Sequence, residues 1–123
     1  MSTQCPVLIG VSGIVQGEMF PLEYGKSVVI GRSRSCDISL RNCKRWLEAE
    51  QAGELSEESA KTVSRKHLKI SFYNAQSIEL EDLSSNGTFV DGKRIDRFVV
   101  TDVKETAHEI QLGAGEKFRL EWR

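Results

Sequence analysis

Three short polar clusters interrupt the apolar stretches of this sequence, and their side chains could bind an anion. They are Gly31-Arg32-Ser33, Ser64-Arg65-Lys66-His67 and Ser84-Ser85-Asn86-Gly87-Thr88. Each cluster supplies hydrogen-bond donors, and two of the three supply an arginine. A phosphate dianion has three acceptor oxygens and a charge of about −1.5 to −2 near neutral pH, so it matches such a set of donors.

The residue types in these clusters suit different parts of a phosphorylated ligand. Arg32 and Arg65 each carry a fork of N–H donors that fits two phosphate oxygens. Serine hydroxyls can bond the remaining oxygens without adding charge. Asn86 offers a donor and an acceptor on one side chain, which suits the main chain of a peptide. The clusters therefore indicate a site for a phosphorylated peptide.

Two pairs of residues, each including His67 of the second cluster, are weaker candidates for catalysis. Ser64 with His67, or Cys36 with His67, would supply a nucleophile and a base. The sequence shows no obvious carboxylate or metal site to complete either pair, so we expect no enzyme activity and no catalytic residue. His67 is expected to be a hydrogen-bonded structural histidine, and His108 an exposed strand residue.

Length and charge limit the classes of protein that this chain can belong to. Its 123 residues are enough for one domain, and we expect residues 1–123 to form a single one. The 17 basic and 18 acidic side chains give a net charge of −1. Such a balance argues against a nucleic-acid-binding protein, which would need a sustained basic excess. Anion recognition is therefore expected to be local.

The cysteines and the N-terminal sequence bear on the cellular compartment. Cys5, Cys36 and Cys43 leave one thiol unpaired in any disulfide scheme, and none belongs to a CxxC motif. We therefore expect no metal, no cofactor and a reducing compartment. The N-terminus does not resemble a signal peptide, and no apolar run approaches the ~18 residues of a membrane helix. A cytoplasmic protein that does not bind membranes is expected.

The elements that must position the clusters are predicted to be short strands. Alternation of apolar and polar residues places Leu68, Ile70 and Phe72 on one face of a strand. Frequent Gly, Asn, Asp and Ser residues separate such segments, which is typical of an antiparallel sandwich or barrel. Strands are expected over residues 7–11, 27–30, 36–40, 67–72, 77–81 and 116–122.

The β pattern stops between residues 41 and 62, where we expect a partly helical insertion. Asn42 could cap a helix over residues 43–52, with Gly53 just past its end. Lys44 and Arg45 in the first turn oppose this helix, because the helix dipole disfavours positive charge there. A second helical turn is expected to begin at Ser56.

Two turn dipeptides lie only five residues apart, at Asn86-Gly87 and Asp91-Gly92. If both closed ordinary hairpins, the strand between them would contain only residues 88–90, which is close to the shortest strand length. One of the two pairs is therefore expected to have another role.

The three clusters in this order, separated by β segments, closely resemble the forkhead-associated (FHA) domain. The motifs that carry the resemblance are GR at residues 31–32, SRxH at residues 64–67 and NGT at residues 86–88. The resemblance extends from about residue 7 to residue 122 and excludes the 41–62 insertion, which lies in the loop before the SRxH motif. It implies an all-β fold, a two-sheet antiparallel β-sandwich of the FHA/SMAD-like kind, that does no catalytic chemistry. It further implies that Asp91-Gly92 is the hairpin turn and that Asn86-Gly87 ends a recognition loop.

The resemblance also implies roles for individual residues. Arg32, Ser64, Arg65 and Ser85 would lie at the phosphate of a phosphothreonine, and Asn86 would hold the main chain of the peptide. Four further residues are expected to shape the loops rather than touch the ligand: Gly31, His67, Gly87 and Thr88. The implied function is a phosphothreonine-dependent interaction module in signalling. Its partner would be a phosphothreonine-containing protein, such as a Ser/Thr kinase or its substrate.

Two departures from the family pattern are visible. Asp91 stands where the family usually has asparagine, and a carboxylate near the binding end could alter peptide preference. The 41–62 insertion is either a solvated surface excursion or a segment that biases partner choice, through its glutamates or through a Trp46-Leu47 contact patch. The alternative function is a phospho-independent scaffold or self-association module that uses the sandwich face or the insertion.

Overall fold

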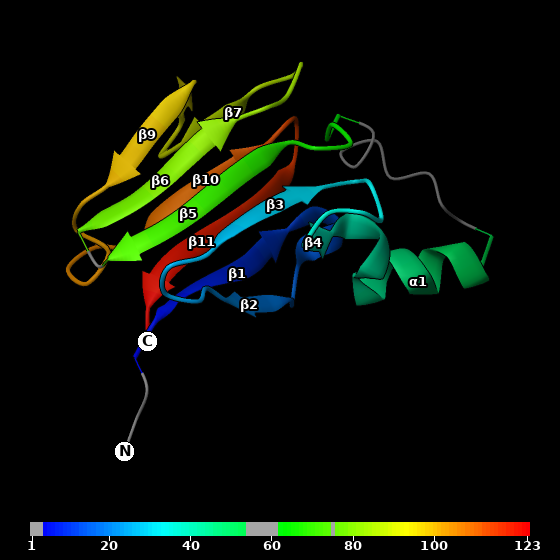
Figure 1. Cartoon of the computed structure of the whole chain (residues 1–123). Coiled ribbons are helices and arrows are strands. Elements are labelled where there is room, and N and C mark those ends of the chain that lie inside the picture. Colours follow the sequence, from blue (N-terminus) through cyan, green and yellow to red (C-terminus); the bar gives the residue numbers. More distant parts are fainter. Residues whose placement is uncertain (1–3, 54–61, 75) are drawn as a thin grey trace.

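The structure is a computed structural model that describes residues 4–53, 62–74 and 76–123. The described residues form two β-sheets packed face to face, with one α-helix at one end of the sandwich (Figure 1). Within these residues, no helix is long and apolar enough to cross a membrane. The expected second helical turn at Ser56 lies outside the described residues.

The larger sheet has six strands and is antiparallel throughout its pairing. In spatial order they are β2 (Met19–Pro21), β1 (Pro6–Ser12), β11 (Glu116–Trp122), β10 (His108–Leu112), β7 (Thr88–Val90) and β8 (Lys93–Ile95). The 3-10 helix η1 (Gly13–Val15) follows β1. Alternation in β11 buries Phe118 and Leu120 completely, as expected for a strand with one face on the core.

The smaller sheet has five strands. Two of the polar clusters lie at the ends of its strands. In spatial order they are β4 (Ile38–Ser39), β3 (Ser27–Gly31), β5 (Leu68–Asn74), β6 (Ser77–Asp82) and β9 (Arg97–Val100). The β3–β4 pair is parallel and the other pairs are antiparallel. Leu68, Ile70 and Phe72 are all buried, which confirms the face predicted for β5.

Asp91-Gly92 forms the hairpin turn between β7 and β8, as predicted. Both residues have positive φ angles, 51° and 84°, and Val90 pairs with Lys93 across the turn. Asp and Gly are the residues that adopt this conformation most readily. The Asp91 carboxylate accepts hydrogen bonds from His108 and from the Glu109 backbone, so it is already engaged within the larger sheet.

The segment before β5 differs from the prediction in its details. Residues 36–40 form a strand only at β4, because the chain turns into the 3-10 helix η2 (Leu40–Asn42). Asn42 therefore does not cap α1 (Lys44–Gln51), and Cys43 takes that position without a side-chain bond. Glu18 instead accepts a hydrogen bond from the Lys44 N–H. This carboxylate supplies the negative charge that the helix's own first turn lacks.

Trp46 anchors α1 to the sandwich. Its side chain is only 6% exposed and belongs to the core cluster, whereas Leu47 is 47% exposed. The proposed Trp46-Leu47 contact patch is therefore wrong for Trp46. Packing of the indole against the core is more favourable than its exposure to solvent, because an aromatic side chain of this size buries a large apolar area.

Candidate functional site

The order of strands in the smaller sheet brings the three polar clusters to one end of the sandwich. β3 ends where the antiparallel β5 begins, so the loop after β3 meets the loop before β5. Arg32 N–H donates to Ser64 O at 3.1 Å, and Ser33 N–H donates to Arg65 O at 3.1 Å. The loop after β6 joins them, because Leu83 N–H donates to His67 O at 2.8 Å. The strand order therefore brings the three polar clusters together.

Gly31 allows the first two loops to come this close. A Cβ atom at this position would overlap the backbone carbonyl of Arg65. The next residue, Arg32, is partly buried, and its Nε donates to the carbonyl oxygen of Val63 at 2.6 Å. This bond fixes the direction of the guanidinium while its two terminal NH₂ groups remain available to a ligand.

Ser64, Ser85 and Asn86 form a second polar cluster across the junction of two loops. The Ser64 and Ser85 hydroxyls lie 3.4 Å apart, and Ser85 N–H donates to Ser64 Oγ at 3.2 Å. The Asn86 amide donates through Nδ2 to the Thr62 carbonyl at 2.9 Å. Ser85 and Asn86 are exposed, so their side chains can reach a ligand.

His67 lies completely buried between the loops and joins two of the motifs. Its Nδ1 lies 3.0 Å from the Ser64 amide nitrogen, and its Nε2 lies 2.8 Å from the Gly87 carbonyl oxygen. A backbone N–H can only donate and a carbonyl can only accept, so the neutral ring carries its proton on Nε2. Burial also lowers the pKa of His67 below its ordinary value, which favours this neutral form.

Asp82 stabilises the third loop by accepting hydrogen bonds from it, a role that the sequence did not reveal. Its Oδ1 accepts hydrogen bonds from Ser84 N–H at 3.0 Å, from Ser84 Oγ at 2.6 Å and from Thr88 Oγ1 at 2.9 Å. Ser84 Oγ in turn accepts from Gly87 N–H at 2.8 Å. Burial opposes the charged carboxylate, but these bonds outweigh it and hold the pKa of Asp82 below its usual range.

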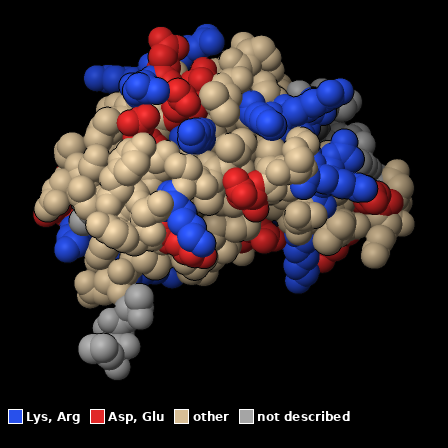
Figure 2. All heavy atoms as spheres, in the orientation of Figure 1, with Lys and Arg blue, Asp and Glu red and all other residues tan. Residues whose placement is uncertain are grey.

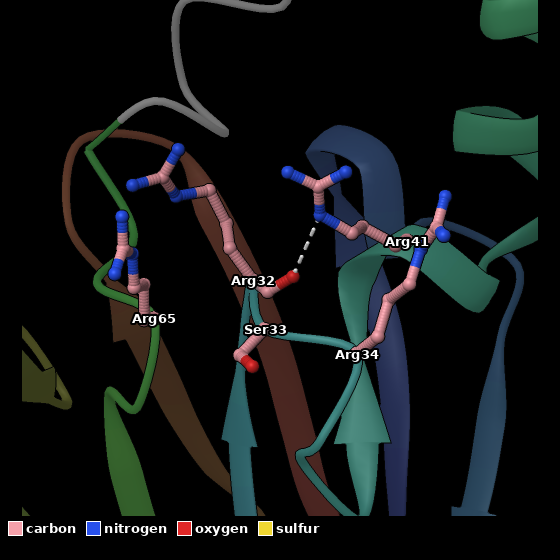
Figure 3. A pocket seen from close by; sticks show the side chains of 5 residues that line it. All are labelled: Arg32, Ser33, Arg34, Arg41 and Arg65. Carbon is pink, nitrogen blue, oxygen red and sulfur yellow. Dashed lines mark hydrogen bonds between the residues drawn. The ribbon is translucent and has the colours of Figure 1, made fainter.

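A pocket of about 500 Å³ opens beside this junction. Figure 3 shows the residues that line it: Arg32, Ser33, Arg34, Arg41 and Arg65. Figure 2 shows Lys and Arg side chains gathered at the end of the molecule that carries the loops and α1. Arg34 and Arg41 were not predicted as site residues, because their proximity to Arg32 depends on the β3–β4 connection and on η2.

The structure thus brings all the predicted residues to one region, in two adjoining groups. Arg32 and Arg65 line the arginine pocket, whereas Ser64, Ser85 and Asn86 form the hydroxyl and amide cluster beside it. Gly31, His67, Gly87 and Thr88 lie beneath them, and all four are buried. An array of arginines, hydroxyls and one amide can bind an anion attached to a peptide.

His108 is the one histidine whose environment was predicted wrongly. Its side chain on β10 is 12% exposed and lies between two carboxylates, with Nδ1 2.6 Å from Asp91 and Nε2 2.7 Å from Asp102. Burial opposes the charged imidazolium, but the two carboxylates outweigh it and raise the pKa of His108. The hairpin turn that contains Asp91 brings one of these partners, which the sequence pattern alone did not show.

Comparison with known proteins identifies the family. The family model of the FHA domain matches residues 28–113. The chain belongs to the FHA domain family. The matched range contains all three polar clusters, and FHA domains are binding modules rather than enzymes. A comparison with curated protein sequences finds no match.

Solved FHA domains share the sandwich of this FHA domain. An FHA domain from Chlamydia trachomatis is 27% identical, with a TM-score of 0.68 over 95% of this chain and 96% of that one. An FHA domain from Arabidopsis thaliana is 22% identical, with a TM-score of 0.68 over 97% and 86%. The N-terminal FHA domain of Rad53p from S. cerevisiae, solved with a phosphothreonine peptide, is 17% identical, with a TM-score of 0.66 over 97% and 94%.

Proposed function

We propose that this FHA domain binds phosphothreonine-containing peptides and thereby recruits a phosphorylated partner protein. The observation that carries the proposal is the hydrogen-bonded junction of three loops, in which the Arg32 N–H donates to the Ser64 carbonyl and the Ser64 and Ser85 hydroxyls lie 3.4 Å apart. The Rad53p domain, which has the same fold, was solved with such a peptide. Another solved FHA domain, 25% identical with a TM-score of 0.62, comes from work on phosphothreonine-dependent interactions.

Each site residue has a role in this proposal that follows from its contacts. The terminal NH₂ groups of Arg32 bind two phosphate oxygens, because Val63 already holds its Nε. The Ser64 and Ser85 hydroxyls bond the phosphate, and the exposed Arg65 adds a second guanidinium. Asn86 donates to Thr62 through Nδ2 and uses its side-chain oxygen to accept a main-chain N–H of the peptide.

Preference for threonine over serine depends on the extra methyl group. Burying one such group contributes roughly 0.8 kcal/mol, which is about a fourfold difference in affinity. A stronger preference would require the loops to restrain the backbone of the peptide as well. A fourfold difference is therefore the smallest preference that the proposal expects.

The partner is proposed to be a Ser/Thr kinase or one of its substrates, and the compartment the cytoplasm. The thiols of the described residues are all free, which suits a reducing environment. Burial, with Glu18 and Glu116 nearby, raises the pKa of Cys43 to about 12 and makes its thiol unreactive.

A peptide library tests the proposal. Each sequence would be presented with phosphothreonine, phosphoserine or unmodified threonine, and binding would be measured by fluorescence anisotropy. We expect binding of phosphothreonine peptides, weaker binding of phosphoserine peptides and none of unmodified ones. Binding to partner proteins that persists after phosphatase treatment would instead favour a phospho-independent scaffold.

A further inference from the structure

The arginine pocket carries more positive charge than one phosphothreonine can neutralise. Four guanidinium groups line it, and arginine stays charged at any physiological pH. A single phosphate carries about −1.5 to −2. No described acidic residue lines the pocket, whereas other arginines of the described chain, such as Arg97 and Arg119, form ion pairs with glutamates. Counting the described residues alone, about two positive charges therefore remain for a second anion.

Arg41 is held in position before any ligand arrives. Its Nε donates to the backbone carbonyl of Arg32 at 3.1 Å, and its guanidinium carbon lies 5.2 Å from the centre of the Trp46 ring. Trp46 is itself fixed, because it is buried and its Nε1 donates to Glu50 at 3.2 Å. A side chain ordered in advance loses less conformational entropy on binding, so Arg41 is prepared to hold an anion.

Arg34 and Arg41 lie on one side of Arg32, and Arg65 lies on the other (Figure 3). All four arginine side chains extend toward the top of this view. Ser64, the partner of Arg32 in the proposed phosphate site, comes from the Arg65 side, because it precedes Arg65 in the same loop. A phosphate held between Arg32 and Ser64 therefore leaves Arg34 and Arg41 free for another group.

We propose that Arg34 and Arg41 form a second anion subsite, so that the preferred ligand carries a second acidic group near the phosphothreonine. This inference rests on the proposed function. The second group is a phosphate or a carboxylate on the same peptide, since the guanidinium fork fits both. The buried Trp46 of α1 acts on this subsite indirectly, as a residue that positions Arg41.

Isothermal titration calorimetry with matched peptides tests the inference at physiological ionic strength, where distant charges are largely screened. The reference peptide carries one phosphothreonine among neutral residues. In the other peptides, a second phosphothreonine or a glutamate replaces each neighbouring position in turn. We expect at least one position at which the second anion raises affinity about fivefold to tenfold, a gain between that of an exposed ion pair and that of a buried hydrogen bond to a charged group.

Three variants test whether this gain in affinity comes from the pocket. Arg34→Gln and Arg41→Gln should each remove most of it, while changing affinity for the reference peptide less than about twofold. Arg45→Gln is the matched control, because it removes a nearby exposed charge from α1 that does not line the pocket. Arg34 is exposed, so its variant remains informative if Arg41→Gln disturbs the fold.

The outcomes separate the two proposals. If the reference peptide binds but no second anion improves binding, the subsite is wrong and the phosphothreonine site stands. If Arg45→Gln lowers the gain as much as Arg34→Gln, the effect is general attraction and the subsite is again wrong. If neither singly nor doubly anionic peptides bind, both proposals fail. Binding of doubly anionic peptides alone would support the subsite.

Discussion

The Nε2 atom of His67 lies 2.8 Å from the carbonyl oxygen of Gly87, and this contact joins two recognition motifs. The other ring nitrogen accepts the Ser64 N–H, so a single buried imidazole fixes both the SRxH serine and the end of the NGT loop. No solvent reaches this side chain. The geometry of the binding surface therefore depends on a residue that does not itself face the ligand.

Replacing His67 with alanine is predicted to destabilise the fold. The substitution leaves the Ser64 N–H and the Gly87 carbonyl without their partner and opens a cavity. We expect a loss of about 2–4 kcal/mol in the free energy of unfolding, the cost of two unsatisfied buried polar groups. Urea denaturation followed by circular dichroism measures this loss. A change below about 0.5 kcal/mol would show that the loops do not depend on the imidazole.

The pKa values of the two histidines are predicted to lie on opposite sides of the ordinary value of about 6.5. Burial lowers the pKa of His67, whereas Asp91 and Asp102 overcome burial and raise that of His108. Because the chain contains only these two histidines, imidazole NMR signals can be followed separately through a pH titration. At pH 6.5 we expect His67 to be mostly neutral and His108 mostly charged. The reverse order would contradict the assigned contacts.

His108 is also predicted to make stability depend on pH. Its raised pKa means that its contribution is full below the unfolded value of about 6.5 and is lost as pH rises through the folded pKa. Asp91 has a lowered pKa, so its contribution is present above about 3.9 and is lost on acidification. The difference in unfolding free energy between wild type and His108→Gln should therefore be largest between about pH 4 and 6.5. A difference independent of pH would exclude this ion cluster.

Gly31→Ala is predicted to disturb both stability and binding. The added methyl group would overlap the Arg65 carbonyl, so the loops after β3 and before β5 must separate. We expect a cost of about 1–3 kcal/mol, typical of overpacking, together with weaker phosphopeptide binding. Gly53→Ala is the control, because its Cβ meets no atom and only its positive φ of 69° opposes the change. That variant should lose about 1–2 kcal/mol and bind normally.

Much of the fold could be predicted from the sequence, because alternating residues report which face of a strand is buried. The alternation at Leu68, Ile70 and Phe72 was sufficient to define β5. Residues 36–40 also alternate, yet most of that segment is not a strand, since Ser39 caps a 3-10 turn by accepting the Arg41 N–H. Local alternation cannot reveal such a competing turn, nor the distant Glu18 that caps α1.

The sequence predicted those residues of the candidate site that belong to its motifs. Arg32, Ser64 and Asn86 belong to recognisable clusters, and the strand order brings these clusters together. Arg34 and Arg41 belong to no motif, and Arg41 reaches the pocket only because η2 returns the chain toward Arg32. Asp82 was missed because its three hydrogen bonds are visible only once the loop is folded.

The central claim is that Arg32 binds the phosphate of a phosphothreonine ligand. Calorimetry of one phosphothreonine peptide with wild type, Arg32→Ala and the control Arg97→Ala tests it most directly, since Arg97 lies on β9 and pairs with Glu81 instead. We predict that Arg32→Ala loses about 1.5–3 kcal/mol of binding free energy, the range for a hydrogen bond to a charged group. Arg97→Ala should bind as wild type. Wild-type affinity in a folded Arg32→Ala domain would contradict the claim.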